Sequence, residues 1–356
     1  MYPDMGVTYT IIFFWLALSI QHIFCLSEFH GILTEEELKA YTKQTSVKEY
    51  DIISPRIQNA PSVRKRSTDS TDHNEAHKVT FTAFDEEHHL TLTKNHWLLI
   101  PGLEVEYVQP DGSIRKEPVQ SRDCHFFATS ISHQGSTGAL STCGGVRGAL
   151  SVKDEMMYIE PLKGGHMKRM KRSMGDDIQP HIIYKRSDSD DELFCPVGQS
   201  AAANSASSGG SGGSNGDVTT YTGAYLGAKF MEIYYVVDGL VYDEHGNDTE
   251  TYAMTVLNIM SRRFADPSLD ISMRISVVRF LISMTTTLTA NNTAGSPVSV
   301  NTSTDSEATL TNFCNWQALQ SVDNDTNQND WDLAILFTGE LSSIPDLPTI
   351  LLLFNV

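Results

Sequence analysis

The sequence has no H-E-x-x-H, the spacing at which one helix presents two histidine ligands and a glutamate base to zinc. The nearest spacing is His73 and His77, which would lie one helical turn apart. The residues around this pair are polar, and no apolar face would hold such a helix against a core. His88 and His89 would point to opposite faces of a strand, so they cannot chelate one ion together. We therefore expect no zinc site at these histidines.

Two acids and one cysteine are the remaining candidate metal ligands. Glu232 and Asp332 lie near the ends of predicted strands, where a carboxylate offers hard oxygen ligands to calcium. Taken alone, each acid is better interpreted as a solvated surface residue, and the calcium assignment depends on the resemblance described below. Cys195 precedes a flexible stretch, and its thiolate could reach a zinc site in the next domain. An unpaired or intermolecular cysteine is the equal alternative.

The charge balance bears on the partners of the chain. Its 356 residues include 44 Asp and Glu against 26 Lys and Arg, a net charge of −18. Nucleic acids are excluded as partners, because phosphate binding needs clustered cations. An acidic surface suits a cation such as calcium better.

Residues 1–27 are typical of a secretory signal peptide. A short apolar run is followed by Cys25 and Ser27, small residues at −3 and −1 of a cut after Ser27. The alternative is a signal anchor, but the run is shorter than the ~20 apolar residues of a membrane span. Secretion permits disulfides, and Cys124 and Cys143 in one compact strand-like segment are the predicted pair.

A basic cluster at residues 168–173 fits the R-x-K-R rule of the secretory-pathway proprotein convertases. Their acidic cleft takes cations at P4, P2 and P1, which Arg169, Lys171 and Arg172 supply, so the cut would precede Ser173. Its position after a β domain favours cleavage over a solvated charge run. Arg186 is a weaker second candidate.

Two different structural patterns flank a Gly/Ser-rich linker at 199–228. Before it, residues 79–161 alternate as short strands punctuated by glycine, with a hairpin-type turn at 109–112. After it, apolar strands at 230–238 and 333–337 and a β-rich strand at 271–280 alternate with helices. We predict a mainly β domain, then an α/β half-domain with βαβαβ order and a mostly parallel sheet.

The two helices of this half-domain have sequence signals of their own. Residues 250–264 place Tyr252, Val256, Met260 and Phe264 on one apolar face. A capping box at 304–307 precedes the second helix. Four glycosylation sequons lie in predicted loops, which agrees with secretion: Asn247, Asn291, Asn301 and Asn324.

Several motifs in order resemble the adamalysin (reprolysin) zinc metalloproteinases. Those of the β domain resemble the prodomain and those of the half-domain the start of the catalytic domain, the ADAMTS branch in particular. The motifs are Ser141-Thr142-Cys143-Gly144-Gly145-Val146-Arg147-Gly148, Tyr158-Ile159-Glu160-Pro161-Leu162, His181-Ile182-Ile183-Tyr184, Ala265-Asp266-Pro267-Ser268-Leu269, Phe313-Cys314-Asn315-Trp316-Gln317 and Trp331-Asp332-Leu333-Ala334-Ile335-Leu336-Phe337-Thr338. Together they cover roughly residues 79–340.

The resemblance implies a metzincin-like fold and a role for several residues. Glu232 and Asp332 fall on calcium-ligand positions of the family. Cys195 resembles the cysteine by which a prodomain blocks the zinc, although it follows the basic cluster instead of preceding it. Cys314 would pair with a cysteine that this chain lacks.

The resemblance also implies an order of domains and a function. We expect a signal peptide (1–27), a prodomain (28–198), the linker (199–228), the N-terminal part of a metalloproteinase domain (229–340) and a divergent tail (341–356). The function would be that of a secreted zinc metalloendopeptidase zymogen of the ADAMTS type acting on extracellular proteins, with extracellular or matrix proteins as its substrates. Lacking the zinc motif, this chain would be truncated and inactive. The alternative is a non-enzymatic secreted protein that binds or inhibits a full-length relative.

Overall fold

The computed structural model describes eleven stretches of the chain, and the signal peptide and linker predictions fall outside them. The stretches are 33–42, 47–59, 77–153, 155–175, 178–186, 229–266, 273–291, 297–301, 306–320, 331–339 and 349–354. A compact unit spans residues 46–356, and residues 1–45 form another that includes helix α2 (Glu35–Thr42). Within the described residues, no helix is long and apolar enough to cross a membrane.

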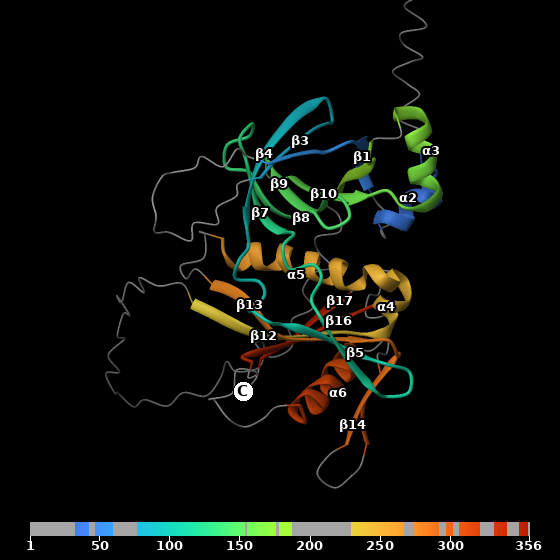
Figure 1. Ribbon diagram of the computed structural model, residues 1–356, viewed down its shortest axis with the longest axis vertical. Coiled ribbons are helices and arrows are strands. Elements are labelled where there is room, and N and C mark those ends of the chain that lie inside the picture. The colour runs from blue at the N-terminus through green and yellow to red at the C-terminus, as the bar shows by residue number, and fades with distance from the viewer. Residues whose placement is uncertain are drawn as a thin grey trace, which may run out of the picture. The chain divides into compact units, whose positions relative to one another are not determined.

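A nine-stranded antiparallel sheet makes up most of the first half, which we term the β segment (residues 47–186) (Figure 1). Its spatial order is β1-β11-β10-β9-β8-β7-β4-β3-β2. The strands are β1 Val47–Ile53, β2 Arg56–Asn59, β3 His77–Ala83, β4 Glu86–Lys94, β7 His125–Ser130, β8 Thr137–Ser141, β9 Arg147–Val152, β10 Glu155–Pro161 and β11 His181–Arg186. Helix α3 (Gly164–Met174) connects β10 to β11.

The remaining described residues, which we term the α/β segment (residues 229–354), build a mixed six-stranded sheet. Its order is β17-β16-β12-β13-β5-β6. The elements are β12 Lys229–Val237, α4 Gly239–His245, η2 Gly246–Asp248, α5 Thr249–Phe264, β13 Met273–Ser283, β14 Thr287–Asn291, β15 Pro297–Asn301, α6 Ser306–Ala318, β16 Leu333–Thr338 and β17 Thr349–Phe354. Strand β12 pairs in parallel with β13 and β16, while β17 pairs antiparallel with β16.

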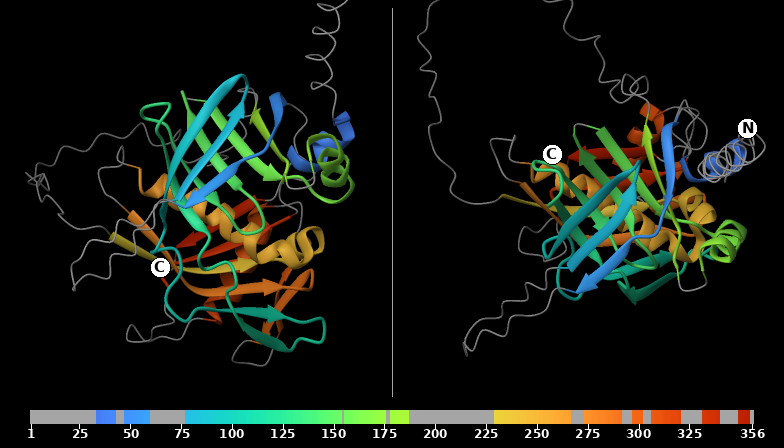
Figure 2. Two further views of the ribbon diagram at one scale, coloured as in Figure 1. Left: turned by 45° about the horizontal axis from the view of Figure 1, so that its top comes forward. Right: turned by 90° about the horizontal axis from the view of Figure 1, so that it is seen from above.

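Two strands of this sheet come from the β segment. Strand β5 (Glu104–Val108) pairs in parallel with β13, and β6 (Ile114–Pro118) completes a hairpin antiparallel to β5. The hairpin therefore leaves the nine-stranded sheet and forms one edge of the other one (Figures 1 and 2). The linker was expected to separate the two parts cleanly, and this expectation is wrong, because the chain crosses between the sheets at β5.

Helix α5 lies between the two sheets, and it makes its closest contacts with β7, β8 and β9 on one side and β13 on the other (Figure 1). Its apolar face was predicted, and Tyr252 and Met260 do pack against the core of the α/β segment. Asn258 and Ser261, which lie off this apolar face, are buried as well. A helix with both faces covered fits between two layers, not on an outer surface.

Candidate functional site

The two predicted calcium ligands lie next to each other at the start of the parallel strands. The Asp332 carboxylate accepts a hydrogen bond from the backbone N–H of Glu232 at 2.8 Å, and the Asp332 N–H donates to the Glu232 carbonyl at 2.9 Å. Both side chains are exposed. Calcium takes six to eight oxygen ligands, so these two acids would be part of a site at most. The calcium assignment stays a prediction.

The side chains of the histidines weighed as zinc ligands lie apart from one another where the structure describes them. Among the described residues, no three His, Cys, Asp or Glu side chains converge as metal ligands. His77 opens β3 and lies edge-on to the Phe126 ring at 5.2 Å, and His73 falls outside the described stretches. His88 is buried and His89 exposed, as the strand alternation predicts. These described residues do not fit a zinc centre.

The predicted disulfide is present between Cys124 and Cys143, whose Cα atoms lie 5.5 Å apart. It joins the residue before β7 to the turn that follows β8. Cys314 lies exposed on α6 and is a free thiol in the structure. Cys195, the latency candidate, lies outside the described residues.

The basic cluster lies inside the β segment, not after it as its position in the sequence suggested. Arg169, Lys171, Arg172 and Ser173 belong to helix α3, which joins two neighbouring strands. The charge run folds as a helix because Met170 supplies a buried apolar contact. Cleavage at Arg172 remains a prediction, now with a helix as the substrate.

Three of the four sequon asparagines lie in described residues, but not in irregular loops as expected. Asn247 is exposed in the single 3₁₀ turn η2. Asn291 ends β14 and Asn301 ends β15, at opposite ends of one antiparallel hairpin. Asn324 is outside the described stretches. Glycosylation at each position stays a prediction.

The most developed site is the contact between the two segments, where side chains of both build one shared hydrophobic cluster. Val105 of β5 is fully buried opposite Phe280 of β13. Upstream of the hairpin, the chain already runs along β13: the Val277 N–H donates to the Leu98 carbonyl at 2.8 Å, and the Ser276 hydroxyl to the Trp97 carbonyl at 2.6 Å. The core of the α/β segment thus includes side chains from the β segment: Leu98, Leu99, Leu103, Val105 and Val119.

Polar ties reinforce this core at the buried face of α5. The Asn258 amide donates to the carbonyls of Phe126 and Leu140, at 3.1 and 3.4 Å, and its oxygen accepts from Asn95 Nδ2 at 3.0 Å. The Glu250 carboxylate accepts the Ser121 N–H at 2.8 Å. Buried polar groups need such partners, because an unpaired one costs about 1–3 kcal/mol. The partners of these α5 side chains all lie in the β segment.

Replacing Asn258 by alanine is expected to lower the free energy of unfolding by roughly 2 kcal/mol, because three buried partners lose their hydrogen bonds. Urea unfolding followed by tryptophan fluorescence measures the change. Asn247→Ala removes the same side chain from an exposed position and should shift stability by less than about 0.5 kcal/mol. Equal effects of the two substitutions would contradict the role given to Asn258.

Two ion pairs cross the same contact. Glu106 of β5 binds Arg279 of β13 at 3.1 Å and Lys116 of β6 at 2.9 Å. Burial raises the pKa of Glu106, but the two cations outweigh it and leave the pKa below its ordinary value. Arg147 of β9 is buried and binds Asp248, ahead of α5, at 2.7 Å. A buried charge pair of this kind fixes geometry more than it adds stability.

The most buried carboxyl group of the α/β segment, Asp238, has a structural role. It ends β12 and caps α4, where its Oδ1 accepts the Val241 N–H at 3.0 Å. The Thr338 hydroxyl donates to its other oxygen at 2.5 Å. Burial raises the pKa of Asp238 above its ordinary value, against these hydrogen bonds. The side chain closes the ends of β12 and β16 and presents no free oxygen to a cleft.

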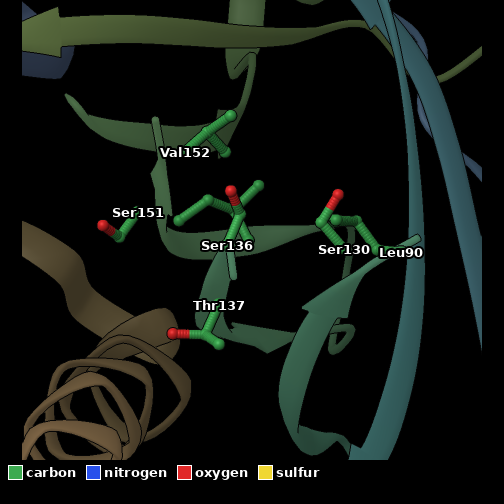
Figure 3. A pocket seen from close by; sticks show the side chains of 7 residues that line it. Leu90, Ser130, Ser136, Thr137, Ser151 and Val152 are labelled. Carbon is green, nitrogen blue, oxygen red and sulfur yellow. The ribbon is translucent and has the colours of Figure 1, made fainter. Parts of the chain in front are cut away.

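Two hollows in the described residues differ in size and in how they are lined. The one shown in Figure 3 lies among Ser130, Ser136, Thr137 and Val152 of the β segment and has no space for a water molecule. A more open surface cleft of about 360 Å³ lies beside Lys94 and Arg122. Arg122 is already committed there, since it donates to the carbonyls of Ile100 and Leu103. The functional candidate is therefore the contact between the segments.

Comparison with known proteins places this contact in a family context. Residues 42–129, which include the β5–β6 hairpin, match the reprolysin family propeptide. The mouse protein "A disintegrin and metalloproteinase with thrombospondin motifs 1" is 23% identical over 360 residues, 91% of this chain and 33% of the relative. The mouse protein "A disintegrin and metalloproteinase with thrombospondin motifs 15" is 26% identical over 319 residues, which are 83% of this chain and 32% of the relative. The human protein "A disintegrin and metalloproteinase with thrombospondin motifs 14" is 27% identical over 209 residues, which are 56% of this chain and 17% of the relative.

The chain spans about a third or less of the length of these relatives. The similarity to the first of these relatives covers 91% of this chain and therefore extends over both the β segment and the α/β segment. The chain is thus ADAMTS-like, with a reprolysin prodomain followed by part of a catalytic domain.

Proposed function

We propose that this chain is the N-terminal portion of a secreted ADAMTS-type zinc metalloendopeptidase zymogen, whose prodomain assembles and covers the first half of the catalytic domain. The observation that carries the proposal is the β5–β6 hairpin, which lies in the propeptide match and forms an edge of the α/β sheet. Without it, the backbone of β13 would lose a strand partner and its apolar neighbours would meet water.

The described residues act as a scaffold in this proposal. The hairpin pairs with β13, the amide of Asn258 ties α5 to β7 and β8, and Glu250 holds the Ser121 backbone. Zinc in the complete family member would activate the water that attacks the peptide bond. The 356 residues contain no H-E-x-x-H, so this chain by itself is proposed to be inactive. Glu232 and Asp332 are proposed as partial calcium ligands, within a metzincin-like fold.

The setting of the proposal is the extracellular space. Residues 1–27 would direct secretion, a proprotein convertase would process the chain, and substrates of the complete enzyme would be extracellular matrix proteins. The similarity to ADAMTS relatives supports this setting. Cys195 is proposed as the latency residue.

Expression of the chain in secretory cells tests both parts of the proposal. We expect the product in the medium with an N-terminus at Glu28, and no chelator-sensitive hydrolysis of a quenched peptide library. Retention in the cells would contradict secretion. Hydrolysis that zinc restores after chelation would contradict the proposed inactivity.

A second candidate function is a non-enzymatic protein that binds a full-length relative. It is favoured by the nature of the contact, because a β-strand edge and a helix face can be presented by another chain as well. In this case the tagged chain should co-purify with a co-expressed full-length relative, and Val105→Asp should abolish the capture. If the tagged chain co-purifies with copies of itself but not with the full-length relative, this second function is refuted and the zymogen proposal is the one that stands.

A further inference from the structure

The position of the basic cluster has a consequence for processing, because helix α3 is an excursion between two hydrogen-bonded strands. Strands β10 and β11 pair antiparallel from Met157 with Lys185 to Pro161 with His181. The chain leaves the sheet at Pro161, forms α3 and returns at His181. A break in the chain at Arg172 therefore removes no strand and no hydrogen bond of the sheet.

Strand β11 is held in the middle of the sheet, not at an edge. It pairs with β1 on one side and β10 on the other, and Ile182 and Ile183 are fully buried. At its start, His181 Nε2 accepts the Val146 N–H at 2.8 Å. At its end, Lys185 binds Glu49 and Glu155, each at 3.1 Å. These contacts come from three other strands or turns, so β11 does not depend on α3 to stay in place.

Helix α3, in contrast, is built to open locally. A protease cleft binds its substrate extended, so residues 169–173 must unwind before cleavage. The helix is only 11 residues long, below the length at which isolated helices are stable. It has no side-chain N-cap, and the like charges of Lys168 and Arg172 repel each other one turn apart. Arg172 is exposed, and Met170 is the buried contact that opposes unwinding.

The second basic pair, Lys185-Arg186, ends β11 itself. The Lys185 ammonium is engaged by two carboxylates, and Lys185 is paired with β1 and β10 while Arg186 is paired with β1. A convertase has to extract these residues from the sheet to bind them. The two sites thus differ both in access and in which product keeps β11.

From this difference we infer that cleavage at Arg172 nicks the chain without releasing the prodomain from the downstream product. The downstream product, which begins at Ser173, keeps β11 as a central strand of the prodomain sheet and stays bound to the prodomain through it. A cut at or after Arg186 leaves β11 with the prodomain, and the products are then held by the contact around β5, β6 and α5 alone. Processing at Arg172 would give a nicked complex that still contains the prodomain. The inference takes from the proposed function only the identity of the protease, a proprotein convertase. The retention of β11 after a cut follows from the sheet itself.

The architecture is tested on the full chain with a cleavage sequence for an unrelated site-specific protease, inserted after residue 172 in one variant and after residue 186 in another. After complete cleavage, each sample is diluted and analysed by native size-exclusion chromatography. The pair cut after 172 is expected to stay together to at least 10-fold lower concentration than the pair cut after 186. Equal dissociation of both pairs, or weaker association of the pair cut after 172, would overturn the inference.

Hydrogen exchange gives a second measurement on the same samples. The amides of residues 182–184 should keep the protection of the uncut chain after the cut at 172, and exchange of α3 should rise. Fast exchange at residues 182–184 in the cut protein would mean that β11 leaves the sheet, contrary to the inference.

Treatment of the unmodified chain with a purified R-x-K-R-directed convertase tests the proposed function separately. A new N-terminus at Ser173 is expected, and Arg172→Ala should remove it. An uncut chain would refute convertase processing. It would not affect the comparison of the two variants cut at the inserted protease sites.

Discussion

Val105→Asp is expected to unfold the contact between the two segments, with a loss of more than about 4 kcal/mol, because it places a carboxylate in a core with no partner. Val105 is fully buried on β5, opposite Phe280, in the cluster that both segments share. The α/β segment should then become sensitive to protease between residues 229 and 339. Limited proteolysis with mass spectrometry locates the cuts, and secreted yield measures the overall effect.

Two further variants keep this prediction testable if Val105→Asp fails to accumulate. Val105→Ala removes two methyl groups and should lower the free energy of unfolding by roughly 2 kcal/mol. Ile114→Asp puts the same charge on β6 of the same hairpin, at a side chain that is 55% exposed, and should be nearly neutral. Equal damage from Ile114→Asp would show that the hairpin responds to charge alone and not to the loss of the shared core.

The elements that local sequence determines were predicted well. Strands β12, β13 and β16 have continuous apolar or β-branched runs, and α5 carries an apolar stripe at helical spacing. The turn at 109–112 was recognised from its Pro-Asp-Gly residues, and the disulfide from the proximity of its cysteines. In each case the signal lies within a few residues of the structure that it determines.

What the sequence did not reveal depends on contacts between distant residues. The turn predicts a hairpin, but nothing within residues 104–118 says which sheet the hairpin joins. Asn258 and Ser261 on the polar face of α5 look like solvent-exposed residues, because only the second sheet makes that face an interior one. The basic cluster at 168–173 was weighed as a cleavage site or a solvated charge run, and its charges gave no sign of the helix in which Met170 is buried.

The candidate site was predicted less completely than the fold. Glu232 and Asp332 do meet, yet through backbone hydrogen bonds that sequence spacing of one hundred residues cannot reveal. The contact between the segments was missed because its parts look ordinary one by one. The site exists only because the two sheets enclose α5. That arrangement brings together a buried asparagine (Asn258), a valine in a short strand (Val105) and a glutamate at a helix start (Glu250).

Acidification is expected to destabilise the β segment between pH 6.5 and 5, because burial lowers the pKa of three of its histidines, His88, His125 and His181, and lowers it most clearly for the last two. Burial lowers the pKa of His125 to about 4, and the Nε2 of this side chain has no hydrogen-bond partner. Burial also lowers the pKa of His181 to about 4, against the hydrogen bond to the Gln179 carbonyl and with the help of nearby Arg147. His181 Nε2 accepts the Val146 N–H, which a protonated ring could not do.

The direction follows from proton binding. An unfolded histidine titrates near pH 6.5, so below that pH the unfolded chain binds protons that the folded chain cannot. Stability is therefore complete above pH 6.5 and falls as the pH drops toward the folded pKa near 4. Two such groups cost on the order of 4 kcal/mol by pH 5. Paired acids such as Glu106, whose pKa is lowered in the fold, lose stability only at more acidic pH.

Urea unfolding at pH 7.5 and pH 5 measures this loss, and substitutions assign it. The double variant His125→Asn and His181→Gln keeps acceptors near the positions of the ring nitrogens but removes both titrations, so most of the pH dependence should disappear. His89→Gln removes an exposed histidine from β4 and should leave the dependence unchanged. An unaltered pH slope in the double variant would mean that other groups carry the acid sensitivity, whereas a flat slope ties the acid stability of the prodomain sheet to two side chains at its centre.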